Sequence, residues 1–329
     1  MRQFLVRFEG LALLVLLAGC FSGCGKGPVR PEAAGEDSRP VQEKGQPREG
    51  EKKAVASPPA LGESFTVATS GTRMLRVEPG TFLMGSPEDE PGREPIETLH
   101  EVTLRGHFWL GAHEVTRLEW EKVMNPVEAP DPEDAPGDGN DDPPADPYSN
   151  VQRPRHPRLE VSWSEAVEFC LQLTAAEEES GHLPPGHAYT LPTEAQWEYA
   201  CRAGTTTATA FGDALGPGDA AIDPQRPYGA VAKARIPKQI NPVGKYKPNA
   251  WGFHDMHGNA AEWCRDFFFA RYPEGPMEDP FHAQPTGLKV KRGGSFFLGG
   301  ASARSAKRGS DSPNRKSDTL GFRIALVRE

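Results

Sequence analysis

Residues 191–204 read LPTEAQWEYACRAG, and the four residues from Thr193 to Gln196 have the form of a capping box. In a capping box the hydroxyl of the first residue accepts a hydrogen bond from an amide of the first helical turn, and the Glu or Gln three positions later reaches back to the cap. Apolar residues at helical spacing follow at Trp197, Ala200 and Cys201. The stretch therefore predicts a helix that begins just after Thr193.

Two further stretches, TRLE from Thr116 and SWSE from Ser162, have the same form and are also followed by apolar residues at helical spacing. The other segments are short alternating runs interrupted by Gly, Pro and Asn, such as FTVAT from Phe65, MLRV from Met74 and HEVTL from His100. A few helices on a loop-rich scaffold of mostly antiparallel strands are typical of the α+β class. We therefore expect an α+β fold without internal repeats.

Seven phrases recur along the chain in a recognisable order: PGTFLMGS (79–86), EVT (114–116), VSWSEA (161–166), LPTEAQWEYACRAG (191–204), PNAWGFHDMHGNAAEW (248–263), RGGSF (292–296) and GFR (321–323). Together they resemble the formylglycine-generating enzyme (sulfatase-modifying factor) family over about residues 70–327. The resemblance implies that residues 65–329 form one domain with a variant of the C-type lectin fold.

Members of that family oxidise a cysteine of a sulfatase to formylglycine, using molecular oxygen and a copper ion held by two cysteine thiolates. The resemblance places these thiolates just after the RGGS phrase, where Leu298 stands near the first position and Ala303 near the second, which falls within residues 301–303. A Cu(I) site needs soft sulfur ligands, which neither side chain supplies. We therefore expect the copper centre to be absent, and we assign no catalytic residue.

The resemblance also implies a structural calcium ion held by the loop that contains Gly-Asn. Carried over by position, its ligands are the Asp255 and Glu262 carboxylates and the backbone carbonyls of Gly258 and Ala260. Carboxylate and carbonyl oxygens are the ligands that Ca²⁺ prefers. The alternative is that this loop only braces a turn.

Two further positions, Ser295 and Arg304, match residues that line the family's substrate groove. They would then contact a peptide or another ligand. The alternative is that the RGGS phrase is a structural turn whose glycines adopt positive φ. His254 and His257 lie three apart, but no third soft ligand is near them in the sequence, so we do not assign them to a metal.

The N-terminus has the pattern of an export signal: Arg2 and Arg7 precede an apolar stretch at 11–18, and LAGC ends at Cys20. LAGC resembles the lipobox of bacterial lipoproteins, which predicts a signal peptide at 1–19 and lipidation of Cys20. A plain secretory peptide and cleavage before Cys24 are the alternatives. The prediction places the protein in the cell envelope, attached to a membrane by lipid. Phe21 favours the outer membrane if the cell is Gram-negative.

Two segments have the composition of chains that cannot bury enough apolar surface to fold. Residues 20–64 are rich in Pro, Gly and charged residues, and we expect a disordered tether. Residues 128–147 are acidic and rich in Pro, and we expect a surface insertion loop.

Export places three cysteines, Cys170, Cys201 and Cys264, in an oxidising compartment. Their number allows at most one disulfide among them, and the alternatives of core residue and disulfide stay open.

The formal net charge of −9, without a dense block of Lys and Arg, argues against a nucleic-acid partner.

Two functions are compatible with these observations. The first is a binding module that displays a surface for a protein, peptide or other ligand and lacks the copper centre. The second is an active oxidoreductase that converts a sulfatase cysteine to formylglycine or modifies another substrate. No Ser/His/Asp or Cys/His arrangement stands out in the sequence, so we favour the binding module.

Overall fold

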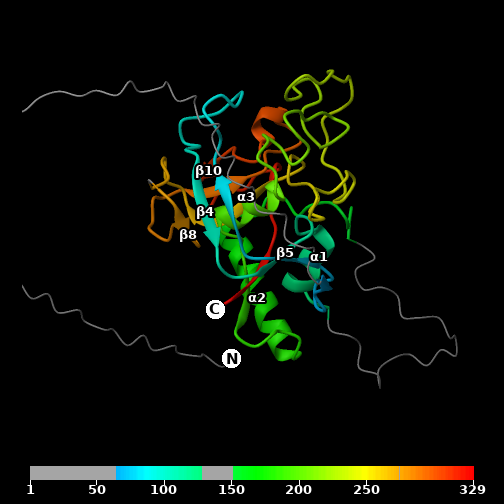
Figure 1. The fold of residues 1–329 in the computed structure, drawn as a ribbon. Coiled ribbons are helices and arrows are strands. Elements are labelled where there is room, and N and C mark those ends of the chain that lie inside the picture. Colours follow the sequence, from blue (N-terminus) through cyan, green and yellow to red (C-terminus); the bar gives the residue numbers. More distant parts are fainter. Residues whose placement is uncertain (1–63, 128–150, 274) are drawn as a thin grey trace, which may run out of the picture. The chain divides into compact units, whose positions relative to one another are not determined.

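The computed structural model describes residues 64–127, 151–273 and 275–329 (Figure 1). The predicted signal peptide, Cys20, Cys24, the tether up to residue 63 and the acidic insertion lie outside the described residues. Within the described ranges, no helix combines the length and apolarity needed to span a bilayer.

Three α-helices in the described residues begin at the three capping boxes. They are α1 (Arg117–Met124), α2 (Trp163–Glu179) and α3 (Glu194–Arg202), with caps at Thr116, Ser162 and Thr193. Each cap hydroxyl accepts a hydrogen bond from the amide three residues later, and the Glu or Gln there accepts one from the cap amide. These bonds satisfy amides that a helix start leaves unpaired, and the three predicted helix starts are confirmed.

The strands form three sheets in the described part of the chain. The first sheet is antiparallel and has the order β1 (Phe65–Thr66), β2 (Arg73–Val77), β5 (Phe108–Gly111), β12 (Ala325–Arg328) and β6 (His187–Thr190). The second sheet has the order β10 (Gly309–Asp311), β9 (Lys289–Arg292), β7 (Ala261–Phe267) and β11 (Leu320–Phe322). The third has the order β3 (Gly80–Met84), β4 (His100–Leu104) and β8 (Met277–Glu278).

Most strand pairs are antiparallel, and the predicted α+β class is confirmed. Two pairs, β7 with β11 and β4 with β8, are parallel. A short 3-10 helix, η1 (Gly300–Ala303), follows β9.

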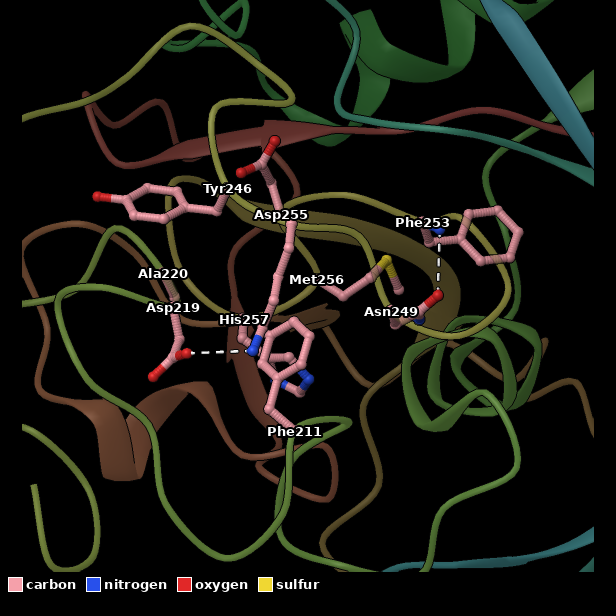
Figure 2. A pocket seen from close by; sticks show the side chains of 10 residues that line it. Phe211, Asp219, Ala220, Tyr246, Asn249, Phe253, Asp255, Met256 and His257 are labelled. Atoms are coloured by element: carbon pink, nitrogen blue, oxygen red, sulfur yellow. Dashed lines mark hydrogen bonds and ion pairs between the residues drawn. The ribbon is translucent and has the colours of Figure 1, made fainter.

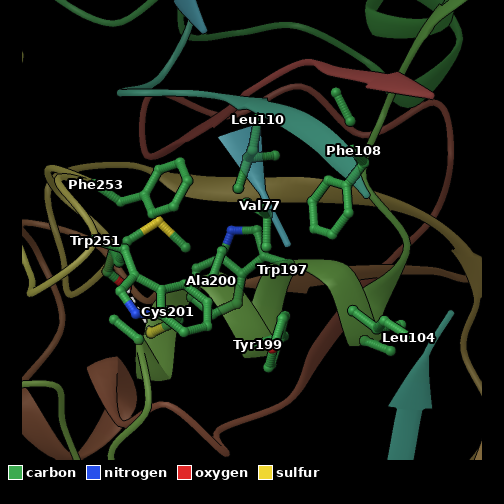
Figure 3. Close-up of a cluster of buried hydrophobic side chains, with 14 of the residues drawn as sticks. Val77, Leu104, Phe108, Leu110, Trp197, Tyr199, Ala200, Cys201, Trp251 and Phe253 are labelled. Atoms are coloured by element: carbon green, nitrogen blue, oxygen red, sulfur yellow. Dashed lines mark hydrogen bonds between the residues drawn. The ribbon is translucent and has the colours of Figure 1, made fainter. Parts of the chain in front are cut away.

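The core is organised around α3. Trp197 is fully buried among Val77, Phe108, Leu110 and Phe253 (Figure 3). A second apolar cluster packs α1 and α2 against β11: the rings of Trp120 and Phe169 stack with centroids 5.6 Å apart, and Phe322 meets Phe169 edge-on. The apolar spacing that predicts each helix therefore marks its buried face.

A network of buried ion pairs crosses this core. Arg308 donates to both carboxylate oxygens of Glu194, at 2.7 and 2.8 Å. Arg292 and Arg202 both pair with Glu198, which is fully buried. Bidentate and shared pairs of this kind compensate charges that would be costly to bury alone. Charged residues of the LPTEAQWEYACRAG and RGGSF phrases thus have a structural role.

Candidate functional site

The RGGS phrase forms a turn at the end of β9. Gly293 and Gly294 have φ of 90° and 69°. A Cβ on Gly294 would lie 2.6 Å from the carbonyl oxygen of Ser302, so the turn requires glycine for its conformation and for the close approach of η1. The turn leads directly into residues 295–298, which the resemblance places at the family's reaction centre.

The positions implied for the copper thiolates hold hydrocarbon side chains in different environments. The Leu298 residue is 41% exposed, and Ala303 in η1 is buried. Phe297, next to Leu298, is 54% exposed. Neither position offers a sulfur, nitrogen or oxygen donor, so these residues do not fit a copper ion.

The two predicted groove residues are both buried. Ser295 is 2% exposed, and its hydroxyl has no hydrogen-bond partner among the described residues. Arg304 is fully buried: it donates to the two carboxylate oxygens of Glu97, each at 2.9 Å, and also pairs with Glu90. The burial and ion pairs of Arg304 give it a structural role, and the place of Ser295 and Arg304 in a substrate groove stays a prediction. The Arg304 guanidinium anchors the loop at 86–97 to η1, because two buried carboxylates need that charge.

The predicted calcium ligands lie on one loop, in which Asp255 and Asn259 have φ of 59° and 57°. The Asp255 carboxylate accepts a hydrogen bond from the amide of Gly244 at 2.7 Å. Glu262 is engaged by other groups: its Oε2 accepts from Trp197 Nε1 at 2.7 Å, and both its oxygens accept from Arg323 at 2.6 Å. The charge of Glu262 is thus compensated by a guanidinium.

Glu114 joins this cluster, although the sequence analysis assigned it no role beyond the EVT phrase. Its Oε1 accepts hydrogen bonds from Asn259 Nδ2 at 3.0 Å and from the Ala260 amide at 3.2 Å. Its Oε2 is buried with no hydrogen-bond partner in the described structure. Burial, and then the negative charges of Asp255 and Glu262, raise the pKa of the Glu114 carboxyl well above its ordinary value.

No group of three or more His, Cys, Asp or Glu side chains within residues 64–127, 151–273 and 275–329 is arranged as it would be around a metal ion. A calcium ion here would depend on Asp255 and on the backbone carbonyls of Gly258 and Ala260, with Glu262 shared with Arg323. Their oxygen donors suit calcium chemically. The calcium site stays a prediction.

His257 lies at a small pocket, together with Asp219, Tyr246 and Asp255 (Figure 2). Its Nδ1 donates to the carbonyl oxygen of Ala303 at 2.7 Å, and its Nε2 accepts from the amide of Ala210 at 3.0 Å. These partners require the neutral ring, and burial lowers the pKa of His257 to about 4. Both nitrogens are occupied, which agrees with leaving His257 out of a metal site.

The structure brings a cysteine next to this histidine, a pairing that the sequence did not show. Cys201 Sγ lies 3.7 Å from His257 Nε2 and 3.7 Å from the Ser305 hydroxyl. The thiol is fully buried, and burial raises its pKa to about 12. Because the Ala210 amide occupies the Nε2 lone pair, the imidazole cannot act as a base for this thiol. Cys170, Cys201 and Cys264 are all free and buried, so they are core residues.

An open groove of about 520 Å³ lies beside the RGGS turn, and we call it the Phe296 groove. It is lined by Arg153, His156, Phe296 and residues 239–242. Asn259 joins two of its walls: its carbonyl oxygen accepts from the Phe296 amide at 2.9 Å, and its Oδ1 accepts from the Asn241 amide at 3.0 Å. The third wall is attached by the Val243 amide, which donates to the Arg155 carbonyl oxygen at 2.9 Å.

The Gly-Asn phrase therefore positions a surface groove, and no motif in the sequence marked that groove or its lining residues Arg153 and His156. The segments that form the walls of the Phe296 groove are far apart in the sequence, so the spacing of residues could not predict that they meet.

The sequence profile described as "Sulfatase-modifying factor enzyme 1-like domain" matches residues 61–328. The chain belongs to this family. The formylglycine-generating enzyme of Streptomyces coelicolor is 36% identical over 189 residues, which cover 53% of this chain and 53% of that enzyme. The formylglycine-generating enzyme of Bos taurus is 26% identical over 300 residues, covering 77% of this chain and 74% of that enzyme.

The solved structure of PvdO from Pseudomonas aeruginosa has the same fold, with a TM-score of 0.62 and 27% identity, covering 81% of this chain and 98% of that one. The resemblance to the formylglycine-generating enzyme family and its fold is thus confirmed. The chain spans about half the length of the Streptomyces relative.

Proposed function

We propose that this member of the formylglycine-generating enzyme family is a lipid-anchored binding module of the cell envelope that lacks the copper–thiolate oxidase centre. The observation that carries the proposal is the chemistry after the RGGS turn. Leu298 and Ala303 occupy the positions implied for the thiolates, and neither can bind a soft metal ion. The three described cysteines are buried elsewhere, and burial raises the pKa of each thiol.

The surface at this place favours binding of a ligand. Phe297 and Leu298 are exposed apolar side chains beside the open Phe296 groove. Large apolar side chains grouped at a concave surface are typical of interaction sites. The amides of Phe296 and Asn241 donate to the backbone and side-chain oxygens of Asn259, so the groove is formed before any ligand arrives.

A structural calcium ion near Asp255 belongs to the same proposal. Two buried carboxylates, those of Glu114 and Glu262, and the half-buried carboxylate of Asp255 lie near the guanidinium of Arg323, which leaves an excess of negative charge. Burial and these neighbouring charges raise the pKa of the Glu114 carboxyl well above its ordinary value, so binding of a proton at Glu114 reduces that excess. Calcium would compensate it instead, so its binding should weaken as the pH falls.

The test of the oxidase is a comparison of the full wild-type chain with the double variant Leu298→Cys/Ala303→Cys. We expect the wild type to bind no Cu(I) in competition with a chelator and to form no aldehyde on a sulfatase-type cysteine peptide supplied with oxygen. The double variant, which restores both thiols at the implied positions, should gain one Cu(I) site. Cu(I) binding with aldehyde formation by the wild type would instead establish the active oxidoreductase.

A further inference from the structure

We infer that the Phe296 groove and its rim bind an acidic peptide segment in which carboxylates alternate with apolar side chains. This inference rests on the proposed binding function and names the chemistry of its partner. The rim consists of Arg226, Lys238, Phe297 and Leu298.

The charge near the groove is opposite to that of the whole chain. Residues 224–247, which contribute one wall and both cations of the rim, contain six Lys or Arg residues and no Asp or Glu, whereas the chain has a formal net charge of −9. Arg153 adds a cation on the facing wall. A local positive potential on an acidic protein attracts anionic partners and repels further copies of the chain.

Two of these cations are attached to the exposed apolar loop. Lys238 Nζ lies 4.6 Å from the centroid of the Phe297 ring, and Arg226 Nη2 donates to the Phe297 carbonyl oxygen at 3.2 Å. The apolar and basic parts of the rim therefore form one continuous surface. The yellow-green loops that carry these cations lie at the same end of the domain as the orange turn of η1 (Figure 1), where the Gly300 amide donates to the Arg226 carbonyl oxygen at 2.8 Å.

A single carboxylate holds both cations without neutralising them. Asp223 Oδ2 is 2.6 Å from Arg226 Nε and 3.0 Å from Lys238 Nζ. The side chain of Asp223 is 3% exposed, whereas those of Lys238 and Arg226 are 34% and 58% exposed. One buried negative charge orients two exposed positive charges, so a net positive charge still faces solvent.

Two polar features of the groove suit a peptide. The ring of His156 lines the groove, and its buried Nδ1 has no hydrogen-bond partner within the described ranges. Gln239 supplies an exposed side-chain amide to the wall, which can donate to and accept from an extended backbone.

The apolar part of the rim distinguishes a peptide from other polyanions. Phe297 and Leu298 are 54% and 41% exposed. A sulfated polysaccharide would use the cations and leave these side chains in water. A peptide with alternating acidic and apolar residues can pair with the cations and also cover the apolar side chains. Successive side chains of an extended chain point in opposite directions, so its two kinds of side chain form two faces.

The experiment measures binding of short synthetic peptides with alternating Glu and Leu or Phe to the full chain, by calorimetry at low and moderate salt. We expect the Glu peptides to bind at least tenfold more tightly than the same peptides with Gln at every Glu, and salt to weaken the difference. Lys238→Glu and Arg153→Glu should each weaken binding by about tenfold. Arg328→Glu makes the same charge change at an exposed residue of a separate pocket and should leave binding unchanged.

Several outcomes would overturn the inference. Equal affinity for Glu and Gln peptides would refute the acidic partner while leaving a binding module in place. Binding that survives Lys238→Glu and Arg153→Glu, or no peptide binding by a chain with a native circular dichroism spectrum, would refute the groove as its site. Vesicles of anionic lipid that bind through Lys238, when peptides do not, would replace the peptide by a membrane surface. Failure of the proposed function itself would appear separately, as Cu(I) binding and aldehyde formation.

Discussion

The neutral imidazole of His257 makes the stability of this domain depend on pH in a defined window. The ring is buried, and its nitrogens bond to the Ala303 carbonyl oxygen and the Ala210 amide. Protonation of Nε2 would set an N–H against the N–H of Ala210. Burial accordingly lowers the pKa of His257 to about 4, from 6.5 for an unperturbed histidine.

The direction of this pH dependence follows from the protons that His257 binds in the folded and in the unfolded chain. Between pH 6.5 and about 4 the unfolded chain binds a proton at this residue and the folded chain does not, so this contribution to stability is lost as the pH falls through that window. The difference between the two pKa values corresponds to about 3 kcal/mol. That is a large fraction of the stability of an ordinary domain.

The perturbation is His257→Asn, whose amide can still donate to Ala303 but cannot be protonated. Leaving the Ala210 amide unpaired should cost about 1–3 kcal/mol at pH 7. In urea unfolding at pH 7 and pH 4, the wild type should therefore lose about 3 kcal/mol more of its stability on acidification than the variant does.

His182→Asn, at an exposed position, is the matched control and should keep the acid dependence of the wild type. The reasoning is refuted if His257→Asn and the wild type lose the same free energy of unfolding between the two pH values. Titration of the folded-state His257 ring near pH 6.5, observed by NMR, would refute it equally.

Four further predictions concern other parts of the chain. Arg304→Met should lower the free energy of unfolding by about 3–5 kcal/mol, because Glu90 and Glu97 would be left buried without their partner; a loss below about 1 kcal/mol in urea unfolding would contradict this. Gly294→Ala should destabilise by more than about 1 kcal/mol, through positive φ and the contact with Ser302, whereas exposed Gly181→Ala has only the φ penalty. Calcium at a hundredfold excess over its Kd should stabilise the wild type by about 2.7 kcal/mol, and Asp255→Asn should abolish the shift in Tm; no shift in the wild type would remove the site. Cys20→Ala should abolish incorporation of labelled fatty acid and Cys24→Ala should not, and labelling that persists in Cys20→Ala would exclude Cys20 as the anchor.

The buried ion pairs explain why family phrases can persist in a chain without the copper ligands. Arg292, Glu194 and Glu198 belong to phrases that carry the resemblance, yet each is buried in the network between α3 and β9. Removing one partner of such a pair leaves a buried charge uncompensated. These residues stabilise the folded core. The resemblance that they carry is therefore stronger evidence for the fold than for the copper-dependent oxidation.

Local features of the sequence determined the helices and the fold class. Each capping box and the apolar spacing after it involve residues within a few positions of one another, and hydrogen bonds of that range form in the same way in any context. The order of the seven phrases along the chain was enough to indicate the family. The presence of Leu298 and Ala303 was enough to show that neither position carries a thiolate.

Only the tertiary structure decided the role of most site residues. Arg304 meets Glu97 across 207 positions, and Asn259 meets Glu114 across 145. No local pattern encodes such a pairing, so the sequence did not show that Arg304 pairs with buried carboxylates, and it assigned no role to Glu114. The Phe296 groove likewise exists only because Asn259 brings residues 239–242 and Phe296 together. The cations of its rim are spaced along a loop and become a patch when that loop folds beside Phe297, because electrostatic potential depends on distance in space and not along the chain.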